Sequence, residues 1–130
     1  MLKLIEHIAI AASDPASLAR WYCDTLGFTM LVAAADSQTY FVGLPGGGIL
    51  EIIPVAPQAK MDPVTHNIGI HHIAFAVADF AAAYQGLQAK GIQFIGPHYE
   101  APDGGTSLDF FIDPEGNRLQ LVYRRQALGA

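Results

Sequence analysis

Short alternations of apolar and polar residues recur along the chain, and two of them, at 4–11 and 70–77, each lead into an alanine-rich stretch. Alternation with a period of two predicts β-strands, because successive side chains of a strand point to opposite faces. The alanine-rich stretches predict helices that run to about Leu26 and about Lys90, and three further short strands follow each helix. The pattern therefore predicts a βαβββ unit twice, which is an α+β fold.

Residues typical of helix ends flank both predicted helices. Asp14 followed by Pro15 supplies an N-cap with proline at the first helical position, and Asp79 supplies the N-cap of the second helix. Gly27 and Gly91 suit the position just after each helix, where a left-handed backbone is common. These residues favour two helices that begin and end at equivalent points of the two units.

The chain contains an internal repeat. The segment HIAIAASDPA at 7–16 is identical to HIAFAVADFA at 72–81 at six of ten positions. Further along, YFVGLPGGGILEII at 40–53 aligns without a gap with DFFIDPEGNRLQLV at 109–122. Similarity at a fixed offset indicates that one structural unit is present twice.

The repeat predicts the domain organisation. We expect a single domain over 1–130, built from units at 1–55 and 70–125 and joined by a linker at 56–69. The second unit carries about five extra residues, which we place in a loop at 97–105, because PHYEAPDGG is rich in turn-forming residues.

Alternation also predicts which side chains share a face. On the opening strands, His7 and His72 each share a face with two alanines, while bulky residues occupy the opposite face. On the last strand of each unit, Glu51 and Gln120 occupy equivalent positions. Small residues beside a polar one leave space, so we expect a curled mixed sheet that forms a cup with the helices outside. If the units pair pseudo-symmetrically, His7, Glu51, His72 and Gln120 project into one cavity.

These four side chains form a plausible donor set for a metal. Two imidazoles, a carboxylate and an amide oxygen suit a divalent ion such as Zn, Ni, Co, Mn or Fe. A strand histidine taken alone is more often a core or surface residue than a ligand, but here both stand at equivalent positions of a repeat. Glu51 lies in the apolar run GILEIIP, where an unpaired carboxylate is costly to bury. We interpret His71 as structural, and His66 and His98 as loop histidines.

Composition and charge restrict the partners. Lys and Arg number 7 and Asp and Glu 12, a net charge of −5, so we expect no nucleic-acid partner. No run approaches the roughly 18 apolar residues of a membrane span, so we expect no membrane partner. The chain has one cysteine, and Glu6 interrupts the apolar N-terminal run that could form a signal-peptide core. These features favour the cytoplasm.

Three segments together carry a resemblance to a known superfamily: HIAIAASDPASLARWYCDTLGF, HHIAFAVADFAAAYQGLQAKGIQF and FFIDPEGNRLQLV. They are similar to the vicinal oxygen chelate superfamily, which includes glyoxalase I, methylmalonyl-CoA epimerase, fosfomycin-resistance thiol transferases, bleomycin-binding proteins and extradiol dioxygenases. The resemblance covers nearly the whole chain. It implies metal ligands on the first and last strands of each unit, here His7, Glu51, His72 and Gln120, and it implies a homodimer.

Gln120 differs from the glutamate that most metal enzymes of that superfamily have at this position. An amide can ligate through its oxygen but cannot accept a proton near pH 7. We therefore expect a metal-dependent, glyoxalase-like lyase, isomerase or epimerase, with Glu51 as the catalytic base. Its substrate would be a small molecule with vicinal oxygens, contacted by Tyr99 and Glu100 of the predicted loop. The alternatives are a non-enzymatic antibiotic-binding protein of the bleomycin-resistance kind and a thiol transferase.

Overall fold

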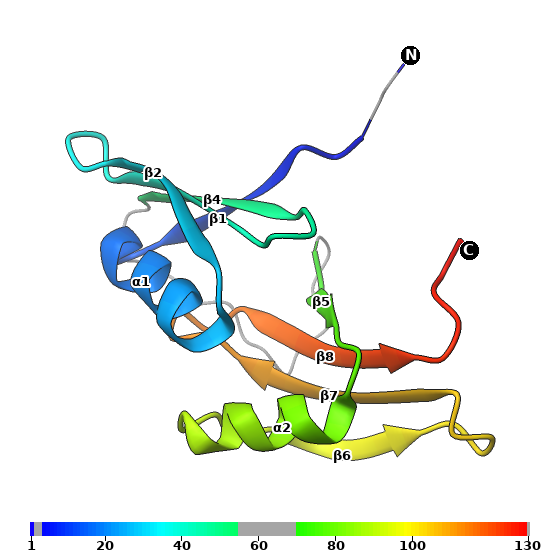
Figure 1. The fold of residues 1–130 in the computed structure, drawn as a ribbon. Helices are drawn as coiled ribbons and strands as arrows, with labels where there is room; N and C mark the ends of the chain where they lie inside the picture. Colours follow the sequence, from blue (N-terminus) through cyan, green and yellow to red (C-terminus); the bar gives the residue numbers. More distant parts are fainter. Residues whose placement is uncertain (2–3, 55–69, 130) are drawn as a thin grey trace. The chain divides into compact units, whose positions relative to one another are not determined.

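The computed structural model describes residues 1, 4–54 and 70–129, and the chain divides into two compact units, Met1–Lys60 and Met61–Ala130. Each unit has the predicted βαβββ order (Figure 1). The first contains β1 (His7–Ala12), α1 (Pro15–Leu26), β2 (Thr29–Ala34), β3 (Thr39–Gly43) and β4 (Ile49–Pro54). The second contains β5 (Ile73–Ala76), α2 (Phe80–Ala89), β6 (Ile95–Glu100), β7 (Thr106–Ile112) and β8 (Arg118–Arg124). The predicted linker at 56–69, with His66, lies outside the described residues.

Each unit forms its own four-stranded mixed sheet. The strand orders are β1-β4-β3-β2 and β5-β8-β7-β6, with β1 parallel to β4, β5 parallel to β8, and the other pairs antiparallel. The two orders are the same, as expected for a repeat, and they confirm the α+β class. Both opening strands are shorter than predicted, because β1 begins at His7 and β5 at Ile73.

The helix ends follow the local sequence. The Asp14 carboxylate accepts a hydrogen bond from the Ser17 amide at 3.0 Å, and Asp79 does the same for Ala82 at 3.0 Å. Such caps satisfy amide groups that the first helical turn leaves without partners. Gly27 closes α1 with a φ of 77°, a left-handed backbone that residues with a Cβ adopt at a cost.

The apolar core of each unit lies between its helix and its sheet. In the first unit Leu18 and Tyr22 of α1 are buried, as are Ile10, Leu50 and Ile52 of the sheet. In the second unit the rings of Tyr84 and Phe94 stack at 4.1 Å, and Phe94 meets the buried Phe111 edge-on. The faces predicted from alternation are confirmed in the first unit, since Ile10 and Ile52 are buried while His7 and Glu51 alternate onto the other face.

The predicted loop at 97–105 is wrong over its first four residues. Residues 97–100 belong to β6, so Tyr99, Glu100 and His98 lie in a strand, and only 101–105 form a turn. Strand β6 is at the edge of its sheet, where proline costs no ladder hydrogen bond. The pairing with β7 shifts register between Ile95 and Tyr99, and Gly96 has a φ of 74° there. A bulge therefore absorbs part of the extra length that we had assigned to a loop.

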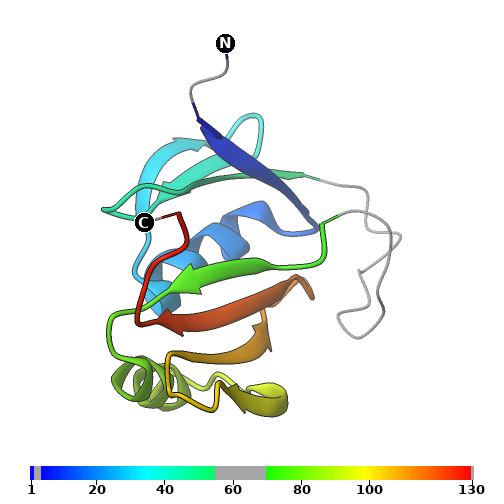
Figure 2. The ribbon, with the colours of Figure 1, turned by 90° about the vertical axis from the view of Figure 1, so that its right-hand side faces the viewer.

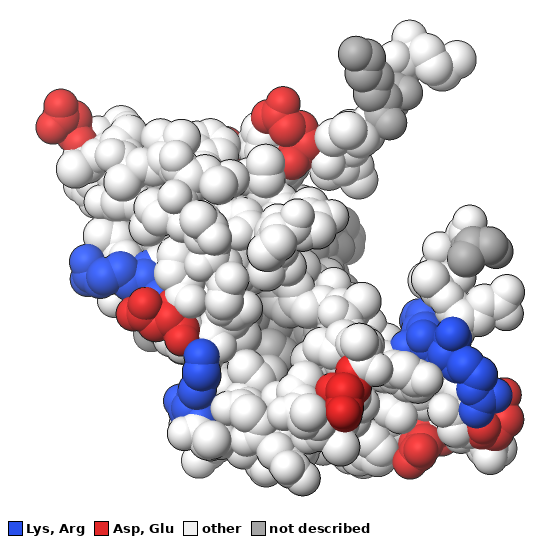
Figure 3. Space-filling model, in the orientation of Figure 1, with Lys and Arg blue, Asp and Glu red and all other residues white. Residues whose placement is uncertain are grey.

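Much of the face drawn in Figure 3 is uncharged. On the face drawn in Figure 3, Lys and Arg side chains and Asp and Glu side chains occur in small separate groups. Within the described part of the chain, no helix is long and apolar enough to cross a membrane. Figure 2 shows α1 lying along one face of the first sheet.

Candidate metal centre

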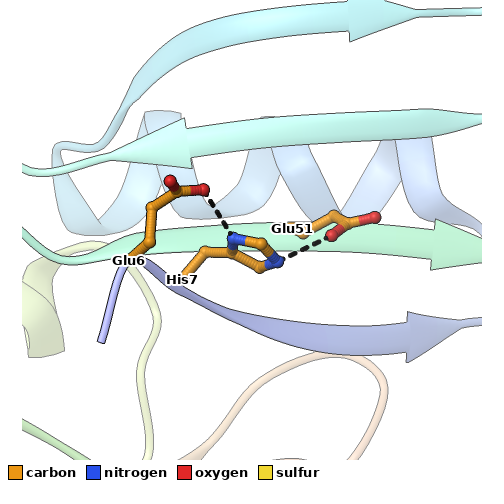
Figure 4. Close-up of polar contacts among 3 residues, drawn as sticks. All are labelled: Glu6, His7 and Glu51. Carbon is orange, nitrogen blue, oxygen red and sulfur yellow. Dashed lines mark hydrogen bonds and ion pairs between the residues drawn. The ribbon is translucent and has the colours of Figure 1, made fainter. Parts of the chain in front are cut away.

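The first unit brings His7 and Glu51 together. The parallel pairing of β1 with β4 sets Ala9 opposite Glu51, so His7, two residues earlier, shares the face of Glu51. His7 Nε2 lies 3.0 Å from Glu51 Oε2 (Figure 4). The two side chains are 34% and 23% exposed, so this contact is open to a small ligand. The structure thus brings these two predicted ligands together, and their role as metal ligands stays a prediction.

Glu6 lies on the other side of the His7 ring. Its Oε1 is 3.1 Å from His7 Nδ1, so both ring nitrogens face carboxylate oxygens (Figure 4). When Nδ1 donates its proton to Glu6, the lone pair of Nε2 faces Glu51 Oε2. Two electron-rich atoms at this distance repel each other unless a proton or a metal cation lies between them.

The donor pair fits a divalent metal. Two ligand atoms held by bonds of about 2.1 Å at about 90° are about 3.0 Å apart, which matches the separation of His7 Nε2 and Glu51 Oε2. A carboxylate on the second nitrogen of a metal-ligating histidine is the usual way in which such rings are oriented. Glu6 occupies that place here.

The second unit places His72 and Gln120 on one face of its sheet. His72 lies directly before β5, and its ring meets Phe110 edge-on at 5.2 Å. Phe110 is the cross-strand partner of Gln120, so the three side chains share a face. Gln120 is buried, with 7% of its surface exposed.

The first unit has the same arrangement. The His7 ring meets Phe41 edge-on at 5.7 Å, and Phe41 is the cross-strand partner of Glu51. The repeat therefore places His7 with Glu51, and His72 with Gln120, at equivalent positions of two equivalent sheets. Convergence of the two pairs on one ion stays a prediction. Among the residues with described positions, no group of three or more His, Cys, Asp or Glu side chains could hold a metal ion.

The surroundings of His72 differ from those of His7. His71 Nδ1 lies 2.8 Å from His72 Nδ1, and the Arg118 guanidinium contacts His71 Nε2. Arg118 also lies over the Phe110 ring, 5.8 Å from its centroid. Burial and, secondarily, the charge of Arg118 lower the pKa of His72 from its usual value of 6.5. One histidine of the repeat thus has anionic neighbours, and the other a cationic one.

A second polar cluster lies on β6 and β7. His98 Nδ1 donates to Asp109 Oδ2 at 2.8 Å, and His98 Nε2 lies 3.6 Å from Glu100 Oε2. Asp109 is 3% exposed, and its hydrogen bond is the main reason why the pKa of His98 is raised. Tyr99 is 50% exposed on the edge strand. The structure thus pairs His98, which we had interpreted as a loop residue, with a buried carboxylate.

Sequence reasoning did not predict the contacts that Glu6, His71 and Arg118 make around the candidate ligands, although it interpreted His71 as structural. The sequence contains a signal for two of these contacts, because the residue directly before each repeat histidine is polar in both units. Alternation predicts that such a neighbour points to the opposite face, so the pattern alone does not reveal the contact. Both residues lie before the first strand residue, where strict alternation no longer holds.

Comparison with known proteins identifies the family. The sequence model of the Glyoxalase/Bleomycin resistance protein/Dioxygenase superfamily matches residues 4–121. The chain belongs to this superfamily. Among superfamily relatives, YaeR of Escherichia coli strain K12, an uncharacterized protein, is 33% identical over 126 residues, covering 92% of this chain and 95% of YaeR.

Relatives with named activities are more distant. Biphenyl-2,3-diol 1,2-dioxygenase 3 of Rhodococcus globerulus is 26% identical over 130 residues, which cover 90% of this chain and 61% of the dioxygenase. A probable lactoylglutathione lyase of Synechocystis sp. (strain ATCC 27184 / PCC 6803 / Kazusa) is 24% identical over 120 residues, covering 89% and 92% of the two chains. The crystal structure of a glyoxalase family protein from Enterococcus faecalis matches with a TM-score of 0.76 and 27% identity. The match covers 92% of this chain and 97% of the Enterococcus faecalis chain.

Proposed function

We propose that this superfamily member is a metal-dependent, glyoxalase-like lyase, isomerase or epimerase that acts on a small substrate with vicinal oxygens. The observation that carries the proposal is the contact of His7 Nε2 with Glu51 Oε2 at 3.0 Å, on the face opposite the helix. Members of the superfamily generally bind a divalent metal. One named relative is a dioxygenase and another is a probable lyase. Membership of the family therefore does not decide which reaction this chain catalyses.

In this proposal His7 and Glu51 hold the metal, and His72 and Gln120 supply the further ligands from the second unit. The identity of the ion among Zn, Ni, Co, Mn and Fe is open, because imidazole and carboxylate donors suit all of them. A divalent ion bound there supplies Lewis acidity, which polarises a carbonyl of the substrate. Glu6 accepts the proton of His7 Nδ1 and thereby keeps Nε2 available as a ligand.

Glu51 is the proposed base. Its carboxylate is partly exposed at 23%, so it can reach a proton on the substrate carbon beside the carbonyl. Gln120, at the equivalent position of the second unit, has no oxygen that accepts a proton at neutral pH. The site therefore has one base for moving a proton. Tyr99 and Glu100, which lie on the exposed edge strand β6, are the proposed substrate contacts.

The test is the metal content of purified full-length protein. We expect close to stoichiometric divalent metal in the wild type and none in His7→Ala, Glu51→Ala or His72→Ala. His98→Gln serves as the matched control, because its ring is paired with Asp109. Equal metal content in all of these proteins would overturn the proposed site. Because imidazole must lose its proton to ligate, metal affinity should also fall at acid pH.

One observation favours a second candidate, a non-enzymatic protein that binds a small molecule. Gln120 stands where a second carboxylate would provide a second base. A site without that base can bind a small molecule without catalysing a reaction. The two functions separate in one assay on an α-hydroxycarbonyl compound. The enzyme contains metal and turns the compound over, whereas the binding protein lacks metal and shows saturable binding without turnover.

A further inference from the structure

Two positions beside the candidate ligands differ in chemistry between the repeat units. The residue before the repeat histidine is Glu6 in the first unit and His71 in the second. The residue two positions before the candidate ligand of the last strand is Ile49 in the first unit and Arg118 in the second. The first unit thus surrounds its candidate ligands with carboxylates, whereas the second brings a permanent positive charge beside them.

The Arg118 side chain lies on the sheet face of the candidate ligands. Arg118 and Gln120 are two positions apart on β8, so their side chains share a face. The Arg118 guanidinium lies over the Phe110 ring, 5.8 Å from its centroid, and Phe110 meets the His72 ring edge-on at 5.2 Å. A molecule that reaches His72 and Gln120 therefore meets the guanidinium as well.

The charge of Arg118 has no protein counter-ion within the described part of the chain. None of the Asp and Glu residues described there forms an ion pair with it. A guanidinium has several N–H donors and stays charged at every physiological pH. Its Nη1 contacts His71 Nε2, and its Nε is buried without a hydrogen-bond partner among the described residues. Arg118 therefore has both charge and donors available for an anion.

A carboxylate is the anion that fits these surroundings best. A planar carboxylate pairs with a planar guanidinium through charge-assisted hydrogen bonds, and each group carries a single charge. A phosphate group carries more charge and would call for further basic residues. Arg124 lies six residues further along β8, roughly 20 Å away in an extended strand, and Arg125 donates to the backbone carbonyl of Asp103. One guanidinium thus stands alone on this part of the strand.

We propose that Arg118 is a specificity-determining residue that binds a carboxylate of the substrate, so that the substrate combines vicinal oxygens with a carboxylate. The inference rests on the proposed function and deepens it by naming the substrate class. The vicinal oxygens lie at the metal, and the carboxylate pairs with Arg118. The Phe110 ring holds the guanidinium in position through a cation–π contact. The bound carboxylate also offsets the positive charge that would otherwise repel a cation held by His72.

The test compares two probes that differ by one charge. Protocatechuate is a catechol with a carboxylate, and protocatechuamide is its neutral amide of nearly the same shape, so both offer vicinal oxygens. We expect calorimetric titration of the Zn²⁺-loaded full chain to show about tenfold tighter binding of protocatechuate, the lower end of the effect of a charge-assisted hydrogen bond. The corresponding phosphonate should bind no more tightly than protocatechuate, and tighter binding would overturn the assignment of a carboxylate.

Variants of Arg118 separate recognition of the charge from a structural role. Arg118→Met should abolish the preference for protocatechuate and leave the affinity for protocatechuamide unchanged, whereas a purely structural role would weaken binding of both probes alike. Arg118→Lys should keep part of the preference. Arg124→Met removes the same charge from the exposed end of β8 and should keep all of it. Circular dichroism checks folding, and Arg118→Gln replaces Arg118→Met if the latter does not fold.

Three results would overturn the inference: no binding of protocatechuate, equal affinity of the wild type for both catechols, or a preference that survives in a folded, uncharged Arg118 variant. Failure of the proposed function appears in a different measurement, as wild-type metal content in His7→Ala and Glu51→Ala. A wild type that takes up no metal would also refute the proposed function, and the same two probes then report on Arg118 in the metal-free chain. The two failures are therefore distinguishable.

Discussion

His7 and His72 stand at equivalent positions of a repeat, yet their neighbours give them different properties. His7 lies between the carboxylates of Glu6 and Glu51, while His72 lies beside His71 with Arg118 behind it. Carboxylates favour a bound cation, and a nearby guanidinium opposes one. The two equivalent positions therefore differ in their electrostatic surroundings.

Glu6→Gln tests the role of the carboxylate behind His7. The amide retains the size of the side chain but removes the charge that orients and polarises the ring. We expect metal affinity to fall by about 10-fold, the lower end of the effect of such groups on metal sites. Calorimetric titration measures this change. Asp36→Asn, in the exposed turn between β2 and β3, removes one charge from the same unit and should leave the affinity unchanged.

Gln120→Glu tests whether this side chain reaches the metal. A carboxylate at ligand distance adds a full negative charge, so divalent metal binding should tighten. Because Gln120 is only 7% exposed, the same substitution should lower the thermal stability of the metal-free protein, and metal should restore it. Melting curves with and without metal provide both readings. Unchanged metal affinity would reduce the protein ligands to His7, Glu51 and His72.

In each unit, the side chain of one aspartate caps the helix. Asp14 and Asp79 each accept an amide hydrogen bond at 3.0 Å in the first turn of their helices. Replacing either by alanine removes that partner, so we expect Asp14→Ala and Asp79→Ala each to lower the unfolding free energy by about 1 kcal/mol. Urea unfolding measures the loss. Ser37→Ala, in the exposed turn before β3, is a control for a surface substitution outside the helices.

The pair of strands β6 and β7 should show a pH-dependent stability. The hydrogen bond to Asp109 raises the pKa of His98 above its usual value of 6.5. A raised histidine pKa contributes stability that is fully present below about pH 6.5 and is lost as the pH rises through the folded-state value. The His98 side chain is 46% exposed, so we expect a contribution below about 1 kcal/mol.

The measurement for this pair is the unfolding free energy of wild type and His98→Gln at pH 5.5 and 8.5. The wild type should exceed the variant by more at the lower pH. Asp109→Asn removes the charged acceptor and should abolish most of that pH dependence. A difference between wild type and His98→Gln that grows as pH rises would contradict this explanation.

At the scale of the whole molecule, we predict a homodimer. The first sheet has β2 at an edge, and Leu31 and Val32 on that strand are 50% and 49% exposed. Edge strands with exposed apolar side chains favour pairing with another chain. Light scattering at micromolar concentration should give twice the mass of the 13.9 kDa chain, and a monomer under these conditions would refute the prediction.

The sequence by itself determined the order of the elements, the helix ends and the residues that share each sheet face. These features depend on neighbours a few positions apart: Asp14 caps an amide three residues later, and alternation separates His7 from Ile8 and Ile10 on β1. The repeat then predicts the same arrangement in the second unit, where His72 and Gln120 occupy the positions of His7 and Glu51.

Tertiary structure decided what depends on residues distant in sequence. The sequence predicts a loop over residues 97–100, because the segment 97–105 is rich in turn-forming residues. Pairing with β7 instead makes residues 97–100 part of an edge strand. Asp109 meets His98 eleven residues away, and Arg118 meets His71 across forty-seven. Neither contact leaves a periodic signal, because each depends on which strands become neighbours. The lowered pKa of His72 follows in part from such a contact, since burial and the charge of Arg118 both depend on the groups that the fold brings to the ring.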